Sequence, residues 1–513
     1  MEARKTVIVI LAVLLSTAVG TVWYVHPDST QDSIQPCLDA CGAGDTVLVA
    51  AGTYHEKLVW PDIQGVRLLS ESGRDSTVID GDSSGTVITI AVEVDTTTAI
   101  EGFTIADGYT NSWGGGIFLT KGGPMIRNNT LTENHAYSGG AICVSSSDSI
   151  YIVDNRFVRN HVTGYGGAAY LYNGTAIVSG NLFERNLADS NAGAVILYME
   201  SGLVQGNAFT GNRADRWHGG LECWGGTAAI VRNTFTYDSC PGGGGALTFV
   251  SCSPNVTGNI VRQCYAGPLG SAAVCCLSSS PTFVGDTFTD NVSTGNWGAI
   301  GCEEGSSPHF SRCLIAGNAW DMCGAVKTSD SSSPTFDSCT ITGNDCSGVY
   351  VGTGSHPSIS NSNIYGNLGY GVRCQSYADS IDACNNWWGD STGPFHPDSN
   401  PGGRGDTVSD GVFFRPWLQD SVFFPGVLES YVQVPVGLPT QATIVRGVLF
   451  LAEATSDKPE AANLMDIAGR EVMKLKPGAN DVNRLGPGVY FIREGLGTGG
   501  EGLGKTQKVV VAR

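Results

Sequence analysis

The chain contains little charge, and positive charge is the scarcer kind. Only 15% of its 513 residues are charged, and 29 Lys and Arg stand against 48 Asp and Glu, which gives a formal net charge of −19. No basic run and no alternation of basic with aromatic residues occurs, although such patterns are what a phosphate backbone requires. We therefore expect no nucleic acid among the partners.

Cysteine pairs with the spacing of a metal site are also absent. None of the 16 cysteines belongs to a C-x-x-C pair, a spacing that zinc sites commonly use. All of them lie from Cys37 onward, which suits a protein that matures in an oxidising compartment. Core packing or disulfides explain these cysteines better than zinc does, and sequence does not reveal any pairing.

The first residues have the pattern of an export signal. Arg4 and Lys5 precede an uncharged apolar stretch from Thr6 to Val25, with small residues up to Gly20. We interpret residues 1–20 as a signal peptide, which leaves no membrane span after cleavage. An uncleaved anchor is the alternative, because the apolar stretch is long enough to cross a bilayer. Both interpretations place most of the chain outside the cytoplasm.

The chain is rich in glycine and contains a short sequence repeat. Glycine supplies 70 of the 513 residues, about twice the usual share. A six-residue phrase from Asn129 to Asn134 returns at a constant interval along the chain. Its first asparagine recurs in equal steps at Asn129, Asn155, Asn181, Asn207, Asn233 and Asn259. A fixed period in the range of roughly 20–50 residues, as here, indicates a repeat architecture.

Each repeat holds three short segments of alternating apolar residues and no amphipathic run of helical length. The pattern predicts one coil of a solenoid, in which strands of successive coils pair in parallel at a spacing of ~4.8 Å. The six asparagines would then form a ladder of hydrogen-bonded amides at one turn. We expect about eleven or twelve coils between residues 77 and 374.

The repeat resembles the right-handed parallel β-helix of the pectin-lyase-like superfamily. The resemblance extends to the family's entry, here residues 32–56 with a turn at Gly52-Thr53-Tyr54, and to a closing turn over residues 385–394. It implies an all-β protein: a right-handed parallel β-helix solenoid followed by a small C-terminal β-sandwich-like domain. Residues 21–76 would form an N-terminal cap with the first strands, and residues 77–418 the β-helix with its closing cap.

Residues 419–513 break the rhythm and resemble the C-terminal sorting domain of proteins exported by the type 9 secretion system. The signature residues are Gly469, Arg470, Gly488 and Tyr490. The resemblance implies a linker and a small β-domain that the secretion machinery recognises. It also implies that the protein is secreted or held on the outer surface of a bacterium. An ordinary β-sandwich appendage is the alternative.

Chemically active side chains gather in the longest turn of each repeat, between the second asparagine and the glycines, which we name the turn edge. Its rings suit sugars or peptide side chains, and the candidate ligand-binding residues are His135, Tyr137, His161, Tyr165, Trp217, Trp297 and Trp320. Asp189 and Asp215 lie one period apart, so stacked carboxylates there would share a proton or hold calcium. A solvated turn with partly buried rings is the alternative.

Glu222 is a carboxylate at a position that is apolar in other repeats. Its counterparts, counted from the paired glycines, are Ile142, Ala169, Val195 and Leu247. Burial there would raise the pKa of Glu222, as a general acid needs. The weak catalytic candidates are therefore Glu222, His218, Asp215 and Asp189. A local shift of register that turns Glu222 outward is the alternative.

These features favour a non-catalytic protein that binds a polysaccharide, a surface glycan or a protein through the turn edge. The Phe-x-x-Asn phrases, as at Phe157 and Phe183, are similar to those of the chlamydial polymorphic membrane proteins, which are adhesins. A polysaccharide lyase or glycoside hydrolase on the same fold is the alternative function. The chain has neither the Asp-Asp pair nor the Gly-His-Gly that a likeness to pectin hydrolases would imply. No cofactor other than calcium is expected.

Overall fold

The computed structural model describes residues 20–27, 32–295, 297–320, 324–375 and 380–422, and seven strands between residues 443 and 511. The chain divides into two units, Met1–Ser430 and Tyr431–Arg513. Each unit is described by itself below, and strand numbers refer to the described residues. The proposed signal peptide, apart from Gly20, lies outside them.

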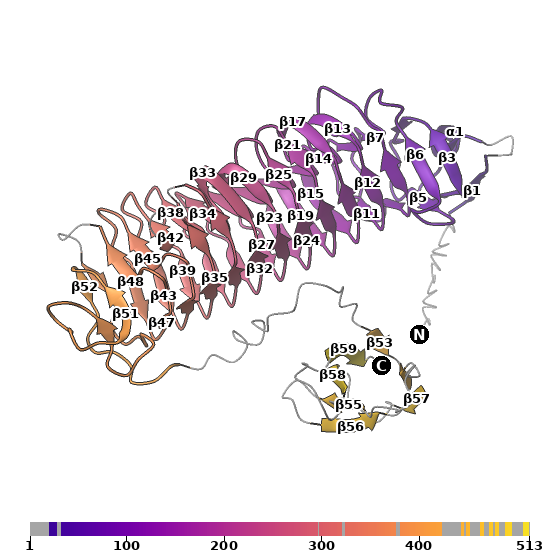
Figure 1. Ribbon diagram of the computed structural model, residues 1–513. Helices are drawn as coiled ribbons and strands as arrows, with labels where there is room; N and C mark the ends of the chain where they lie inside the picture. The colour runs from indigo at the N-terminus through magenta and orange to yellow at the C-terminus, as the bar shows by residue number, and fades with distance from the viewer. Residues whose placement is uncertain are drawn as a thin grey trace, which may run out of the picture. The chain divides into compact units, whose positions relative to one another are not determined.

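The first unit is an all-β parallel solenoid of about thirteen turns, in which successive coils stack along one axis (Figure 1). Every strand pair of this unit is parallel, and partners in the central coils lie one repeat period apart, as with Phe157 and Phe183. Among the described residues the single helix is α1 (Ile34–Ala40), which buries Ile34, Cys37 and Leu38 at the N-terminal end. The predicted repeat is thus confirmed as a parallel β-solenoid.

Three long sheets run the length of the unit. Sheet A has sixteen strands in the order β1 (Val22–Val25), β2 (Thr46–Val49), β5 (Arg67–Ser70), β8 (Ala99–Glu101), β11 (Met125–Arg127), β15 (Ser147–Val153), β19 (Gly174–Ser179), β23 (Ser201–Gln205), β27 (Ala229–Val231), β31 (Asn255–Thr257), β35 (Thr282–Val284), β39 (His309–Ser311), β43 (Thr335–Asp337), β46 (Ser358–Ser360), β49 (Ile381–Asp382) and β52 (Val412–Phe413). Because β1 already pairs with β2, the stacking begins well before residue 77.

Sheet B follows sheet A in each coil. Its thirteen strands are β3 (Gly52–His55), β6 (Thr77–Asp80), β9 (Thr104–Ala106), β12 (Thr130–Thr132), β16 (Arg156–Val158), β20 (Leu182–Glu184), β24 (Ala208–Thr210), β28 (Thr234–Thr236), β32 (Ile260–Arg262), β36 (Thr287–Thr289), β40 (Leu314–Ala316), β44 (Thr340–Thr342) and β47 (Asn363–Tyr365).

Sheet C closes each coil before the chain returns to sheet A. Its fifteen strands are β4 (Leu58–Val59), β7 (Ile88–Ile90), β10 (Ile117–Leu119), β14 (Ile142–Val144), β18 (Ala169–Tyr172), β22 (Val195–Tyr198), β26 (Leu221–Trp224), β30 (Leu247–Val250), β34 (Val274–Leu277), β38 (Ile300–Glu303), β42 (Gly324–Thr328), β45 (Ser347–Val351), β48 (Tyr370–Cys374), β51 (Gly405–Val408) and β50 (Pro394–Phe395).

A fourth sheet, D, lies between sheets B and C in the middle coils, where the sequence predicted only a long turn. Its eight strands are β13 (His135–Ser138), β17 (His161–Tyr165), β21 (Leu187–Ala188), β25 (Arg213–Ala214), β29 (Ser239–Gly244), β33 (Tyr265–Ser271), β37 (Val292–Ser293) and β41 (Ala319–Trp320). The turn edge is therefore a short parallel sheet, with side chains that stack as in the longer sheets.

Identical residues stack above one another in the core. The rings of Phe157, Phe183, Phe209 and Phe235 are fully buried, and their centroids are 4.5–4.7 Å apart in nearly parallel planes. Two cysteines stack in a column of sheet C: Cys276 pairs in register with Cys302, and both are buried free thiols. These two cysteines therefore pack in the core rather than join coils covalently.

The asparagines at the turn between sheets A and B form a continuous ladder. Asn129, Asn155, Asn181, Asn207, Asn233 and Asn259 are buried, and each Nδ2 donates to the Oδ1 of the next asparagine at 2.9–3.2 Å. The same Oδ1 also accepts the backbone N–H of the preceding asparagine, as Asn155 does from Asn129 at 2.9 Å. The residue before each ladder position has a left-handed φ, such as +56° at Asn128, which Asn and Gly tolerate.

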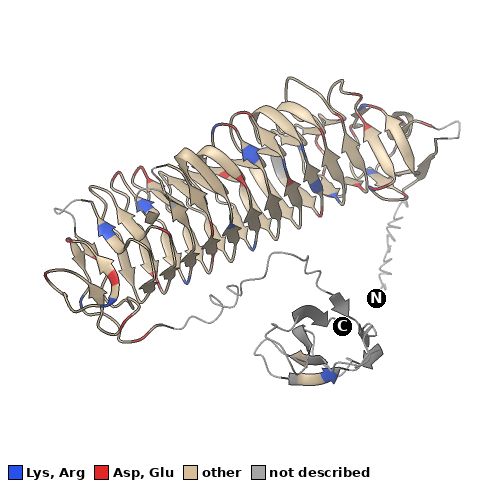
Figure 2. Ribbon diagram, in the orientation of Figure 1, with Lys and Arg blue, Asp and Glu red and all other residues tan. Residues whose placement is uncertain are grey.

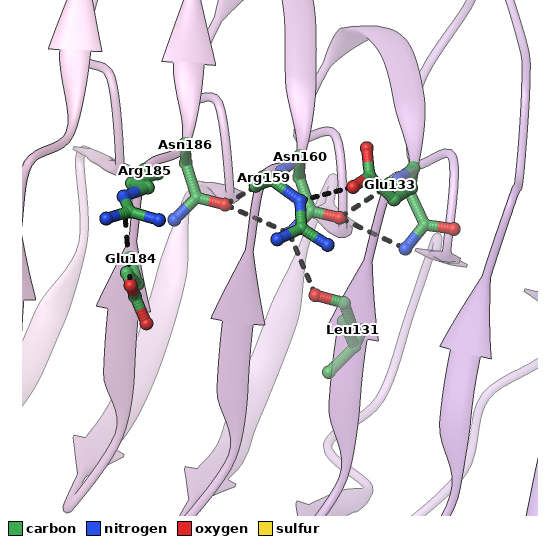
Figure 3. A network of polar contacts seen from close by, with 8 residues as sticks. Leu131, Glu133, Arg159, Asn160, Glu184, Arg185 and Asn186 are labelled. Carbon is green, nitrogen blue, oxygen red and sulfur yellow. Dashed lines mark hydrogen bonds and ion pairs between the residues drawn. The ribbon is translucent and has the colours of Figure 1, made fainter.

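A second amide ladder stands at the turn between sheet B and sheet D. Asn134, Asn160, Asn186 and Asn212 are linked Nδ2 to Oδ1 at 2.9–3.1 Å, and Asp238 accepts from Asn212 at 2.8 Å. Figure 3 shows Asn160 donating to the carbonyl of Leu131, next to the ion pair between Arg159 and Glu133. Two corners of each central coil are thus held by buried amides.

The second unit contains two small sheets. A five-stranded sheet has the order β53 (Thr443–Val445), β59 (Thr506–Val511), β58 (Gly488–Glu494), β55 (Ala462–Met465), β56 (Glu471–Leu475), and β54 (Val448–Leu451) pairs with β57 (Gly478–Asp481). All pairs are antiparallel except β53 with β59. Gly488 and Tyr490 of the sorting signature lie on β58, whereas Gly469 and Arg470 are outside the described residues.

The first ladder makes a testable prediction. Replacing Asn207 by Leu removes the bonds to Val178 O and Asn233 Oδ1 and leaves the backbone N–H of Asn181 without its acceptor, whereas Asn181 Nδ2 keeps its bond to Ile152 O. We expect the free energy of unfolding to fall by about 1–3 kcal/mol, because buried polar groups lose their partners. Chemical denaturation measures it, with Asn255→Leu on the exposed face of β31 as control. Equal midpoints for the two variants would contradict the role of the ladder.

Candidate functional site

Sheet D covers part of the outer face of sheet C. Its inward residues Ala136, Val162, Ala188 and Ala214 form a small buried cluster of their own. Outward positions of sheet C in the same coils are buried as well, among them Cys143, Ile196 and Thr248. The candidate site therefore consists of the outer surface of sheet D and the part of sheet C that it leaves uncovered.

One column of sheet D carries aromatic and imidazole rings on consecutive coils. The Tyr109 ring stacks on His135 with centroids 4.6 Å apart and planes 9° apart. His135 Nδ1 lies 3.1 Å from His161 Nδ1, and His161 Nε2 lies 2.8 Å from Asp189 Oδ1. Burial, followed by the nearby His161, lowers the pKa of His135. The structure thus brings together two of the predicted binding histidines with a predicted carboxylate.

The other turn-edge rings fall into separate places. Tyr137 and Tyr165 meet edge to face at 5.9 Å, and both are exposed. Trp217 is also exposed, and it lies over Gly242 so closely that a Cβ there would overlap the indole. Trp297 instead lies under the Lys327 ammonium, 4.1 Å from the ring centroid. The backbone of Trp320 is on β41, and its side chain is outside the described residues.

The two aspartates considered for calcium each have another partner. Asp189 bonds to His161, and Asp215 Oδ1 lies 2.8 Å from Arg213 Nε. A carboxylate already paired with a cationic or hydrogen-bonding side chain is a poorer calcium ligand, because the pairing must first be broken. The geometry therefore disfavours a calcium site at Asp189 and Asp215.

Glu222 does not occupy the apolar column to which counting from the glycines assigned it. The strand register pairs Leu221 with Val195 and Leu247, and Glu222 with Ile196 and Thr248. Gly220 takes the place that alanine has in other coils, so the count from the glycines was wrong by one residue. Since alternate residues of a strand face opposite sides, Glu222 points outward, yet it is only 1% exposed.

His218 covers Glu222 from a strained backbone position. Its φ is +62°, at a corner where neighbouring coils have Gly166 at +68° and Ala192 at +55°. His218 Nε2 lies 3.5 Å from Glu222 Oε1, and in the described structure neither Glu222 oxygen nor His218 Nδ1 has a hydrogen-bond partner. Burial lowers the pKa of His218 to about 3 and raises the pKa of Glu222 to about 8. Burial therefore disfavours the charged form of both groups.

A second group of rings, which the sequence analysis did not single out, lies on the uncovered part of sheet C. Tyr172, Tyr198 and Trp224 are in register on β18, β22 and β26. The Tyr172 and Tyr198 centroids are 5.3 Å apart, and those of Tyr198 and Trp224 are 5.6 Å apart. Tyr172 and Trp224 are 39% and 41% exposed. Their common spacing of one repeat period is the signal that would have revealed them.

Tyr170 joins these rings to the turn edge. It stacks on Tyr172 at 6.5 Å. Burial, with further contributions from neighbours that include Tyr198 and Tyr165, raises the pKa of Tyr170 to about 12. We name the continuous surface of Tyr137, Tyr165, Tyr170, Tyr172, Tyr198 and Trp224 the aromatic face. Most charged residues lie at turns and few on the strands, as Figure 2 shows.

The fold and this site define a parallel β-solenoid with an aromatic surface built over consecutive coils. The family described as "Right handed beta helix region" matches residues 65–236 and 296–387, just over half of the chain. The chain belongs to this family, which also establishes the right-handed coil. No curated protein matches the chain significantly. The part of the chain that the structure describes holds no helix with the length and hydropathy to cross a membrane.

The buried Glu222 predicts how stability depends on pH. The pKa of Glu222 rises from an ordinary 4.5 to about 8 on burial, so between these values the folded state holds a proton that the unfolded state has lost. The free energy of unfolding contributed by this group therefore falls as pH rises from about 4.5 to 8. Glu222→Gln should raise the melting temperature at pH 8 and change it little at pH 4.5, an effect on the order of 2–4 kcal/mol at pH 8.

Thermal unfolding across pH 4.5–8 checks this, and Glu71→Gln, at an exposed loop carboxylate, is the control. The lowered pKa of His218 makes the free energy of unfolding fall as pH drops below about 6.5. This effect is present in both the wild type and Glu222→Gln. A difference in melting temperature between wild type and Glu222→Gln that does not grow with pH would contradict the neutral buried carboxyl.

Proposed function

We propose that this protein is an exported glycan-binding protein that acts at or near a cell surface. The observation that carries the proposal is the column formed by Tyr172, Tyr198 and Trp224, whose rings pack one above another on three consecutive coils, with Tyr172 and Trp224 exposed. A contiguous exposed apolar surface usually marks a binding site. Flat rings about one strand spacing apart suit a chain of sugar rings that runs along the solenoid axis.

The charge of the protein favours a neutral glycan. A formal net charge of −19 repels polyanions such as uronic-acid polymers at low and moderate salt. The six residues of the aromatic face carry no charge at neutral pH, and their hydroxyl and indole N–H groups can bond to sugar hydroxyls. A surface protein that presents similar side chains remains the second ligand class for the same face.

The aromatic face yields a direct binding test. Trp224→Ala and Tyr198→Ala should each weaken binding to a neutral polysaccharide at least about tenfold, which corresponds to about 1.4 kcal/mol. Trp217→Ala tests whether the ligand reaches sheet D. Tyr237→Ala is the matched control, because Tyr237 is an exposed ring at the turn between sheets B and D.

A glycan array followed by calorimetry measures these effects, and thermal unfolding shows whether each variant folds. Binding that is equal in wild type, Trp224→Ala and Tyr198→Ala would contradict the proposal. If Trp217→Ala alone weakens binding, the ligand lies near Trp217, and the column of Tyr198 and Trp224 is not the site.

A polysaccharide lyase or glycoside hydrolase is the second candidate function. The observation that favours it is the Glu222 carboxyl, whose raised pKa of about 8 would let it act as an acid beside His218. Burial weighs against it, because Glu222 is 1% and His218 6% exposed, and a general acid must reach the bond it protonates. Release of reducing ends or unsaturated products that is lost in Glu222→Gln would establish the enzymatic alternative.

We further propose that the second unit directs export as a sorting domain of the type 9 secretion system. Two features support this: it is a separate unit of short strands, and β58 carries Gly488 and Tyr490 of the signature. The partner would be the secretion machinery of a bacterium, and the product would be secreted or held on the outer surface.

Deletion of residues 464–513 tests this export role. The solenoid should keep its far-ultraviolet circular dichroism and its melting temperature, because its coils contact mainly their neighbours, while the protein no longer reaches the surface. Cell fractionation and surface labelling measure delivery. Normal delivery of the shortened chain would contradict the proposal, and an aggregated solenoid would instead assign the unit a capping role.

A further inference from the structure

The imidazoles of His135 and His161 on sheet D lie nitrogen to nitrogen, an arrangement that the binding of sugar rings does not require. His135 and His161 are register partners on β13 and β17, and their Nδ1 atoms are only 3.1 Å apart. At that distance two neutral rings must share a single proton, since one nitrogen has to donate and the other accept. The two Nδ1 atoms therefore face each other across one shared proton.

Asp189 determines which nitrogen of His161 carries the proton. Asp189 Oδ1 lies 2.8 Å from His161 Nε2, so Nε2 donates to the carboxylate and Nδ1 presents its lone pair. Hydrogen bonding of the remote imidazole N–H to a carboxylate is the usual outer-shell arrangement of a metal-binding histidine, where it orients the ring and raises its basicity. His135 is oriented in turn by its stack on Tyr109.

We propose that His135 and His161 bind a divalent transition metal ion, such as Zn²⁺ or Cu²⁺, through their Nδ1 atoms, with Asp189 as the outer-shell partner of His161. Two nitrogens at about 2.0–2.1 Å from one metal lie about 2.9 Å apart at a right angle and about 3.3 Å apart at the tetrahedral angle. The observed 3.1 Å falls between these values, so the two nitrogens are already at a ligating distance, and each ring has to turn by about 40° to direct its lone pair at the metal.

The proton balance of this site is simple. In the metal-free protein His135 Nδ1–H donates to His161 Nδ1; on binding, His135 changes tautomer, its proton moves to Nε2 by way of solvent, and both Nδ1 lone pairs coordinate the metal. The remaining coordination positions are filled by water or by oxygen atoms of a bound molecule, because the His161 side chain is 36% exposed. Protonation of either ring competes with the metal, so affinity falls in acid.

The experiment uses the full-length protein and the metal salts alone. Calorimetry with ZnCl2 and electron paramagnetic resonance with one equivalent of CuCl2 should show a site with two nitrogen ligands. His135→Phe and His161→Phe, which keep a flat ring in the stack, should each raise the Kd for Zn²⁺ at least tenfold. Asp189→Ala should raise it about 10- to 100-fold and leave the two-nitrogen copper spectrum in place, as expected for an outer-shell partner.

Two controls address the other metal-capable clusters of the described residues, which are His55 with Asp80 and Asp82, and His396 with Asp398 and Asp410. His55→Phe and His396→Phe should leave the two-nitrogen signal unchanged. The proposal is overturned if wild type binds neither metal, if the double variant His135→Phe, His161→Phe binds as wild type does, or if the signal disappears in either control. Melting temperatures of all variants show that the loss of binding is not a loss of fold.

Discussion

Buried amides that stand one above another are the constraint on which the rest of this structure depends. Each ladder asparagine bonds to the amide of the next coil and to backbone groups of the coil before, so it must occupy the same height in every coil. A coil that slipped by one residue would leave buried donors unpaired and would turn its inward side chains toward solvent. The ladder therefore fixes the register of all the sheets at once, and the stacked phenylalanines between Phe157 and Phe235 follow from it.

The same constraint explains which parts of the fold the sequence predicts. A strict repeat period predicts parallel coils, the ladder from Asn129 to Asn259 and the buried phenylalanines, because each demands the same residue type in every coil. Sheet D escaped notice since its outward residues vary from coil to coil, from His135 to Arg213. About eleven or twelve coils were expected, and the structure has about thirteen, because its sheets continue into N-terminal strands with weaker repeats.

The site was less predictable, for reasons that differ from residue to residue. Glu222 was misplaced because a glycine takes the place of alanine at residue 220, and an error of one residue reverses the direction of a strand side chain. Tyr172, Tyr198 and Trp224 share the repeat period, but they lie outside the turn edge, where the sequence pattern places most of the other rings. The bond between Asp189 and His161 depends on how side chains lean across neighbouring coils, and spacing alone predicted a pair of aspartates instead.

Packing constrains the inward residues of a coil much more than the outward residues, and the candidate binding residues are outward ones. An inward residue must match its neighbours in the coils on both sides, so the core repeats one chemistry over many coils. An outward residue need not match the residues above and below it. Its position is still set by the register that the ladder imposes. Side chains of one kind at equivalent positions of consecutive coils therefore lie about one strand spacing apart. The rings from Tyr172 to Trp224 and the imidazoles of His135 and His161 are examples. The αL backbone of His218 shows the limit of that freedom, because this corner, which is glycine at Gly166 and Gly243, accepts a side chain, as at Ala192 and His218, only at a conformational cost.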